Sequence, residues 1–253
     1  MKKTNNELEK YINQSLHEKF DKIAVLKESP KSSIYVFANK KTGQKIIERI
    51  SKNRNDEVFR TIRNKEIKNL AEIYEVCSTE DYLITIEEFI EGENLSNIIS
   101  EKRLSKKLAC KYACQICNAL IGLHERGIVH RDIKPENIII SNDSNAYLID
   151  LSIARMINSS NKKDTQSLGT VGYAAPEQYG IIQSNSSTDL YALGIVLNQM
   201  ITGMHPSIET TRSVPLKRII KKATSMQISR RYKNAKQMRI RLKILSKIYI
   251  KII

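Results

Sequence analysis

The chain has 253 residues, of which 41% are hydrophobic, so it can bury a sizeable core, and this composition excludes an intrinsically disordered protein. Its formal net charge of +15 fits nucleic acid or an anionic membrane as a partner. No basic stretch is interleaved with stacking aromatics, so we interpret the charge as a lysine-rich solvated surface spread along the chain, and we expect no specific nucleic-acid partner, with weak membrane-surface contact as the alternative.

The first part of the chain is predicted to form strands after an N-terminal extension over residues 1–20. The extension lacks the apolar run of a signal peptide, and no stretch reaches the roughly 18 apolar residues of a transmembrane helix, so we expect a cytoplasmic protein. A charged stretch over residues 56–68 is compatible with a helix. The short β-branched runs that predict strands are Lys22–Leu26, Ser33–Ala38, Gln44–Ile50, Ile73–Cys77 and Tyr82–Ile90.

From Leu95 onward the pattern turns mainly helical. Ser105 is placed to cap a long helix that ends near Arg126–Gly127. Apolar residues recur in it every three or four positions, which marks a face turned to the core. The sequence therefore predicts an α+β chain with a small β-rich lobe over residues 21–90 and a larger helical lobe over residues 91–253.

Three of the four cysteines, Cys110, Cys114 and Cys117, form a group that resembles a metal site. Their spacing of four and three residues places them on one stripe of the long helix, whereas zinc ligands usually come from turns and include a fourth ligand nearby. We interpret them as buried thiols and expect no disulfides.

The segment with the clearest chemistry is His130–Asn137, followed thirteen residues later by Asp150 at the end of a strand-like run. Phosphoryl transfer needs a carboxylate beside the attacking hydroxyl, a cation near the transferred group, and oxygen ligands that hold Mg²⁺ on the phosphates. Asp132 can be that carboxylate and Lys134 that cation. Asn137 and Asp150 can supply the hard oxygen ligands.

With these residues the sequence resembles the eukaryotic-like (Hanks-type) bacterial serine/threonine protein kinases. Gly169–Glu177 resembles the end of their activation segment, Asp189–Gly194 the start of a later helix, and Arg231 an arginine that pairs with the glutamate of the A-P-E triplet. Lys134 and Thr170 favour serine/threonine kinases over tyrosine kinases. The resemblance covers nearly the whole chain.

The resemblance implies the bilobal α+β protein kinase fold, ATP with Mg²⁺ or Mn²⁺, and a protein substrate with serine or threonine hydroxyls. Asp132, Lys134, Asn137 and Asp150 are the implied catalytic residues, the last two also as metal ligands. The residues implied to contact the nucleotide are Ile34, Arg49, Glu57, Glu88 and Ile90.

The N-terminal half departs from the family. The glycine-rich phosphate loop aligns on Lys27–Ile34, which contains no glycine, so nucleotide binding should be weaker or differently shaped. The metal-binding triplet is Asp150–Ser152 rather than D-F-G. Glu87 brings a charge to a position that is usually apolar.

Arginine also replaces the lysine that the family places on the third strand, at Arg49. Arginine keeps the charge, but its planar fork is bulkier and not interchangeable with lysine. We expect it to pair with Glu57, with Glu66 as the alternative position of the helix glutamate, and Glu87 is a second carboxylate that its fork can reach.

Three functions therefore compete. An active protein kinase with an unusual nucleotide lobe is favoured because every acidic and polar group of the chemistry is in place. A pseudokinase that binds nucleotide or protein as a scaffold is the main alternative. A kinase of small molecules fits less well, because such enzymes usually lack an A-P-E segment.

Two further expectations concern the activation segment. Glu177 and Arg231 should form a buried structural pair. Arg131, next to Asp132, is expected to be an unpaired cation until it meets a phosphate, and the resemblance favours autophosphorylation at Thr165 or Ser167 as the activating event.

Overall fold

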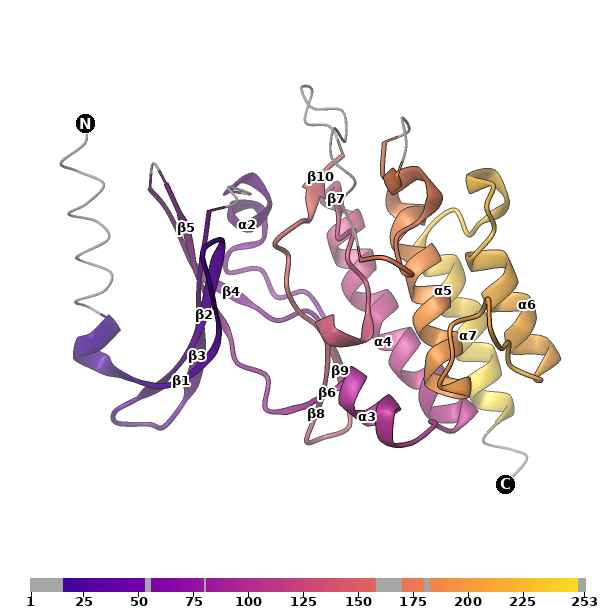
Figure 1. Cartoon of the computed structure of the whole chain (residues 1–253), viewed down its shortest axis with the longest axis horizontal. Coiled ribbons are helices and arrows are strands. Elements are labelled where there is room, and N and C mark those ends of the chain that lie inside the picture. The colour runs from indigo at the N-terminus through magenta and orange to yellow at the C-terminus, as the bar shows by residue number, and fades with distance from the viewer. Residues whose placement is uncertain (1–15, 53–55, 80, 158–169, 180–182, 250–253) are drawn as a thin grey trace. The chain divides into compact units, whose positions relative to one another are not determined.

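The computed structural model describes residues 16–52, 56–79, 81–157, 170–179 and 183–249 (Figure 1). It divides the chain into two compact units. The first comprises Met1–Glu66 and Ala71–Ile90, and the second comprises Ile67–Leu70 and Glu91–Ile253.

The first unit is built on a five-stranded antiparallel sheet in the order β1-β2-β3-β5-β4. Its β-branched runs form strands because such side chains pack well on a pleated surface. A small core of Leu16, Phe37 and Ile46 lies against this sheet. The elements of the unit are β1 (Phe20–Ser29), β2 (Ser32–Asn39), β3 (Lys45–Ser51), α2 (Asp56–Ile62), β4 (Ile73–Ser78) and β5 (Leu83–Glu88). All five predicted strands are present.

The helix α2 is shorter than the charged stretch over residues 56–68 predicted. It ends at Ile62 because Asn64 adopts a left-handed backbone with φ of 53°, and its N–H donates to the carbonyl of Ile73 at 2.8 Å. Residues 67–70 then join the second unit, where the side chain of Asn69 donates to the carbonyl of Ala146 at 2.9 Å.

The second unit is mainly helical and carries two small sheets, β6-β8-β9 and β10-β7. Its strands are β6 (Gly92–Asn94), β7 (Ile128–Val129), β8 (Ile138–Ser141), β9 (Ala146–Leu148) and β10 (Arg155–Met156). Its helices and 3₁₀ turns are α3 (Leu95–Glu101), α4 (Lys106–His124), η1 (Pro135–Asn137), η2 (Pro176–Tyr179), α5 (Ser186–Thr202), α6 (Val214–Ala223), η3 (Ile228–Arg230) and α7 (Ala235–Ile248). The chain thus has the α+β organisation expected from the sequence, β-rich first and helical after.

The long helix α4 begins where the sequence predicted. The hydroxyl of Ser105 accepts a hydrogen bond from the N–H of Leu108 at 3.2 Å and caps it. Helix α5 has a capping box made by Asn185 and Thr188, and Gly203 ends it with φ of 75°. Among the described residues, no helix is long and apolar enough to cross a membrane.

The cysteines of α4 line its inner side as expected. Cys110 and Cys117 are buried, Cys114 is half-buried, and none forms a disulfide. Burial raises the pKa of Cys110 to about 12 and that of Cys114 to about 11. Such thiols stay protonated near neutral pH and act as small apolar packing groups.

Candidate active site

The backbone of the segment His130–Asn137 is fixed by one carboxylate from α5. Asp189 accepts the N–H of Arg131 on Oδ1 at 2.8 Å and the N–H of His130 on Oδ2 at 3.0 Å. His124, at the end of α4, places its Nε2 2.8 Å from the same Oδ2. Burial raises the pKa of Asp189, but these donors and the nearby histidines outweigh burial and hold it below its ordinary value. The carboxylate is therefore an ionised anchor for the loop.

This anchor explains the backbone of Arg131, which has φ of 69° although it is not glycine. A left-handed conformation is costly for a residue with a Cβ and persists where its surroundings fix it. The carbonyl of Arg131 also accepts from Gln178 Nε2 at 2.9 Å. Its side chain is buried and donates through Nε to the carbonyl of Ile153 at 2.7 Å, so the guanidinium already has a hydrogen-bond partner. A carbonyl supplies no counter-charge, and the expected pairing of Arg131 with a phosphate stays a prediction.

The side chains of Lys134 and Thr170 both contact the carboxylate of Asp132. Lys134 Nζ lies 2.9 Å from Asp132 Oδ2, and Thr170 Oγ1 donates to Asp132 Oδ1 at 2.7 Å. Lys134 Nζ also donates to Thr170 Oγ1 at 2.8 Å. A threonine hydroxyl is thus held between a carboxylate and an ammonium group, which is the environment that an attacking hydroxyl requires.

Asn137 and Asp150 were predicted as metal ligands. Asn137 Nδ2 donates to the backbone carbonyl of Asp132 at 2.8 Å and to its Oδ2 at 2.9 Å, so its amide oxygen is the atom left for a ligand. The Ile149 N–H donates to the Asn137 carbonyl at 3.0 Å, which ties the residue before Asp150 to the loop. Asp150 has φ of 65°, and its Oδ1 accepts from the Ser152 N–H at 3.0 Å. One amide oxygen and one carboxylate are hard donors that fit Mg²⁺ or Mn²⁺.

The ring of His130 forms hydrogen bonds with backbone groups on either side of Asn137. Its Nδ1 accepts the N–H of Asp132 at 3.3 Å, and its Nε2 lies 3.2 Å from the carbonyl of Ile149. A ring that carries a proton on Nε2 and accepts on Nδ1 satisfies both contacts. The histidine therefore links Asp132 to the strand end that carries Asp150.

Arg49 has a buried ion pair within the first unit. Its Nε donates to Glu87 Oε1 at 2.9 Å and its Nη2 to Glu87 Oε2 at 3.4 Å. Thr85 Oγ1 donates to the same Oε1 at 2.6 Å. Arg49 on β3 faces Thr85 on β5 and Ile34 on β2, so the three residues lie side by side on one face of the sheet, and Glu87 follows two positions after Thr85.

The expected Arg49–Glu57 pair is not formed. Glu57 is exposed on α2, its carboxylate makes no ion pair in the described part of the chain, and the same holds for Glu66. Val58, Phe59 and Ile62 face the core, which leaves Glu57 on the outer side of this short helix. The partner is Glu87, the second carboxylate considered, because strand register places it on the face of Arg49.

The segment aligned with the glycine-rich loop is a tight hairpin between β1 and β2. Ser29 pairs with Ser32, and Pro30 and Lys31 form the two-residue turn. Ser29 Oγ donates to the carbonyl of Ser32 at 2.8 Å and accepts the Ser32 N–H at 3.1 Å. The side chain of Ser29 thus closes a turn in the segment that aligns with the glycine-rich loop.

Of the other residues expected to contact nucleotide, Ile34 lies on β2, whereas Glu88 and Ile90 lie at the end of the first unit. The N–H of Glu88 donates to the carbonyl of Glu72 at 2.8 Å, and Glu88 Oε2 accepts the Glu72 N–H at 3.1 Å. Burial, together with the charge of Glu72, raises the pKa of Glu88 despite that backbone hydrogen bond. Ile34 and Ile90 are half-buried.

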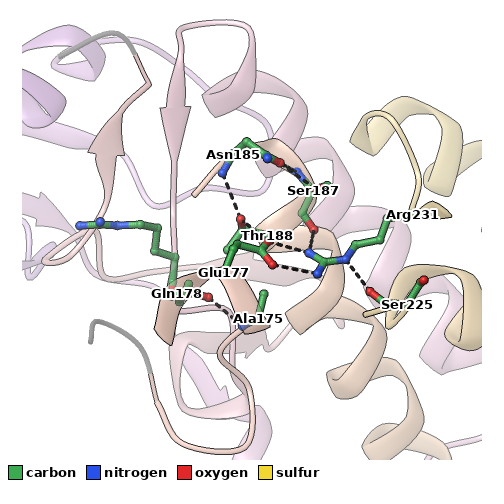
Figure 2. A network of polar contacts seen from close by, with 9 residues as sticks. Ala175, Glu177, Gln178, Asn185, Ser187, Thr188, Ser225 and Arg231 are labelled. Atoms are coloured by element: carbon green, nitrogen blue, oxygen red, sulfur yellow. Dashed lines mark hydrogen bonds and ion pairs between the residues drawn. The ribbon is translucent and has the colours of Figure 1, made fainter. Parts of the chain in front are cut away.

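Glu177 and Arg231 form the predicted structural pair (Figure 2). Arg231 Nη1 lies 2.7 Å from Glu177 Oε1, and Nη2 lies 2.8 Å from Oε2, a bidentate arrangement. Thr188 Oγ1 donates to Glu177 Oε1 at 2.8 Å, and Arg231 also donates to the carbonyls of Ser225 and Ser187. Both side chains of the pair are almost fully buried. The end of the activation segment is thereby fixed to α5.

Sequence reasoning missed the contacts made by two residues. Asp189 was noted as a helix start, and Gln178 was not assigned its structural partner. The candidate phosphorylation sites Thr165 and Ser167 lie outside the described residues.

Comparisons with known proteins agree with this geometry. Residues 22–251 match the protein kinase domain family. The chain is 30% identical over 84% of its length to a probable serine/threonine-protein kinase of Clostridium perfringens, and 36% identical over 60% of its length to the serine/threonine-protein kinase PrkC of Bacillus subtilis. It covers 33% and 24% of those two proteins, so it spans about a third of their length or less.

Proposed function

The chain belongs to the protein kinase domain family, and from this membership we propose that it transfers the γ-phosphoryl group of ATP to serine or threonine hydroxyls of proteins. The observation that carries the proposal is the cluster of Asp132, Lys134 and Thr170, in which a hydroxyl already lies between a carboxylate and an ammonium group. Proteins named serine/threonine kinases among its relatives support the same assignment.

In this proposal Asp132 orients the substrate hydroxyl and accepts its proton as the oxygen attacks phosphorus. Lys134 places its positive charge beside the transferred group, where negative charge develops. Thr170 holds Asp132 and Lys134 in register before a substrate arrives. The contacts of Asn137 with Asp132 keep the metal ligand and the base in one rigid group.

Asn137 and Asp150 would hold Mg²⁺ or Mn²⁺, which neutralises phosphate charge when bound. Arg49 would contact the phosphates of ATP, its fork fixed by Glu87. Ile34, Glu88 and Ile90 would contact the rest of the nucleotide. The exposed Glu57 makes no described contact that supports a role in nucleotide binding.

The pseudokinase alternative rests on the glycine-free hairpin and on Arg49. Against it stand Asp132, Lys134 and Asn137 in one hydrogen-bonded cluster, with Asp150 kept further along the chain, a set that a scaffold does not need. A small-molecule kinase is disfavoured by the Glu177–Arg231 pair, which fixes an activation segment of the protein kinase type.

Transfer of labelled phosphate from ATP to a generic basic protein, with Mg²⁺ and with a chelator, tests the proposal. We expect label on serine and threonine only, and only with metal. ATP binding without any transfer, to the basic protein or to the chain itself, would establish the pseudokinase instead.

A further inference from the structure

The positive charge of this chain is concentrated in its C-terminal part. Residues 210–253 contain fourteen Lys or Arg and no Asp or Glu, which leaves 28 Lys or Arg against 27 Asp or Glu in residues 1–209. The basic residues are spread along the chain as interpreted, but the last acidic residue is Glu209, so the net charge is not spread in the same way. One end of the second unit carries nearly all of the net charge.

Most of these cations point into solvent. Arg231 and Arg239 are exceptions, since Arg231 pairs with Glu177 and Arg239 donates to Asn118 Oδ1 at 2.7 Å. The exposed ones among the described residues are Arg212, Lys217, Arg218, Lys221, Lys222, Arg230, Lys233, Lys236, Arg241, Lys243 and Lys247. Helices α6 and α7 pack against each other (Figure 1). Together they carry eight of these exposed cations.

Helix α7 has two apolar faces, although its packing needs only one. The inner face buries Ala235, Met238, Leu242 and Leu245, and the helix packs mainly against α4. On the outer side Ile240, Ile244 and Ile248 are 55%, 48% and 45% exposed. Their spacing of four residues aligns them in one stripe along the helix.

Cations border this isoleucine stripe on both sides. At 100° per residue, Lys236, Lys243 and Lys247 follow one edge and Arg241 lies at the other. The helix itself contains no acidic residue. Lys236 is the one border cation with a carboxylate partner in the described structure, Glu125 at 2.7 Å.

We propose that the outer face of α7 binds the surface of an anionic membrane. Aliphatic side chains that can enter the headgroup region, bordered by cations that can meet lipid phosphates, are the arrangement of an interfacial helix. Nucleic acid would be attracted by the cations but has no use for the isoleucine stripe, and aromatic stacking groups are absent from it. The cations of α6 add long-range attraction to the negative charge of the membrane surface.

Co-sedimentation of the full chain with phosphatidylcholine vesicles, with and without phosphatidylglycerol, tests the inference. We expect binding to the anionic vesicles only. Lys243→Gln with Lys247→Gln should weaken it by about 25-fold, at about fivefold per cation. Ile240→Ser with Ile244→Ser should weaken it by about tenfold. Ile208→Ser, which changes an isoleucine of the same unit that is 75% exposed, is the control and should bind as wild type does.

A spectroscopic test does not depend on these losses. The chain has no tryptophan, so Ile244→Trp creates a single reporter. Its emission should shift to the blue when phosphatidylglycerol vesicles are added, whereas that of Ile208→Trp should not. An unshifted Ile244→Trp spectrum, or equal binding to neutral vesicles, overturns the inference.

Two further results separate membrane binding from polyanion binding and from kinase activity. If the isoleucine variant binds anionic vesicles like wild type and a nucleic-acid duplex displaces them, the surface is a polyanion site and the inference fails. Because α7 lies outside the catalytic cluster, the isoleucine variant should transfer phosphate in solution as wild type does. A chain that binds vesicles without any transfer would leave this inference intact and refute only the proposed kinase function.

Discussion

Arg49 and Glu87 form a buried pair within one sheet, joined by two hydrogen bonds between neighbouring strands. In the related kinases the cation on this strand is expected to pair with a glutamate from a helix. Here the helix glutamate is exposed, and the counter-charge comes from the sheet itself. The position of the Arg49 guanidinium therefore depends on strand register rather than on the placement of α2.

Glu87→Gln should weaken ATP use because it loosens this pair. We expect KM for ATP to rise more than kcat falls, since the lost contact positions a phosphate-binding group rather than the base. Breaking a buried pair should also cost roughly 3–5 kcal/mol of stability in urea unfolding. Arg63→Ala, which breaks the exposed Arg63–Glu75 pair, should cost at most about 1 kcal/mol. Equal stability losses in the two variants would contradict this account.

Asp132→Asn should abolish phosphoryl transfer and leave ATP binding almost unchanged. Its carboxylate acts on the substrate hydroxyl, and the amide of asparagine cannot accept the proton. Labelled-phosphate transfer and calorimetric ATP titration measure the two properties separately. Substantial turnover by the variant, under conditions where wild type is active, would remove Asp132 from its assigned role.

Asp150→Ala should weaken ATP binding in the presence of Mg²⁺ and abolish turnover. The reason is the loss of a hard oxygen ligand at the metal. Ser152→Gly is the matched control, because it keeps the backbone N–H that bonds Asp150 and restores the residue usual in the family. If wild-type ATP affinity is the same with a chelator present, the metal assignment is wrong.

Phosphate on Thr165 or Ser167 should be found in active wild-type protein and not in Asp132→Asn. Both hydroxyls lie just ahead of Thr170 in the sequence, and a phosphate there can order a loop against arginine. Mass spectrometry of wild type and Asp132→Asn measures whether these positions carry phosphate. Full activity of a Thr165→Ala, Ser167→Ala double variant would show that no such switch operates.

Local patterns in the sequence predicted the parts of this structure that depend on near neighbours. The five strands, the cap at Ser105 and the cysteine stripe of α4 follow from β-branched runs, side-chain type and helical spacing. The Glu177–Arg231 pair, 54 residues apart, was predictable only through the family resemblance. The end of α2 at Ile62 was missed because the charged run continues past Asn64, the residue that adopts a left-handed conformation.

Contacts fixed by register or by a buried hub could not be predicted from local patterns. Glu87 was considered only as a second carboxylate for Arg49, because choosing it over Glu57 requires knowing how β3 and β5 align. Asp189 anchors a loop 58 residues earlier in the chain, and no local pattern carries that information. The concentration of net charge can be counted from the sequence. Inferring a membrane-binding surface also requires knowing which cations and isoleucines are exposed on α7.

Glu177→Gln should destabilise the second unit and change how its stability depends on pH. Removing one charge leaves Arg231 buried without its counter-charge, which costs roughly 3–5 kcal/mol at neutral pH.

Burial raises the pKa of Glu177, but hydrogen bonds from Arg231 and Thr188 outweigh it, so the pKa lies below the ordinary 4.5. A group whose folded pKa is lowered stabilises the fold above its unfolded pKa, and this contribution disappears as pH falls through the folded pKa. Urea unfolding should therefore show wild type losing stability below about pH 4.5 more steeply than Glu177→Gln. Lys236→Gln, which breaks the exposed pair with Glu125, should barely change the unfolding midpoint at neutral pH. Parallel acid profiles of wild type and Glu177→Gln would mean that the bidentate contact contributes no net ionic stabilisation.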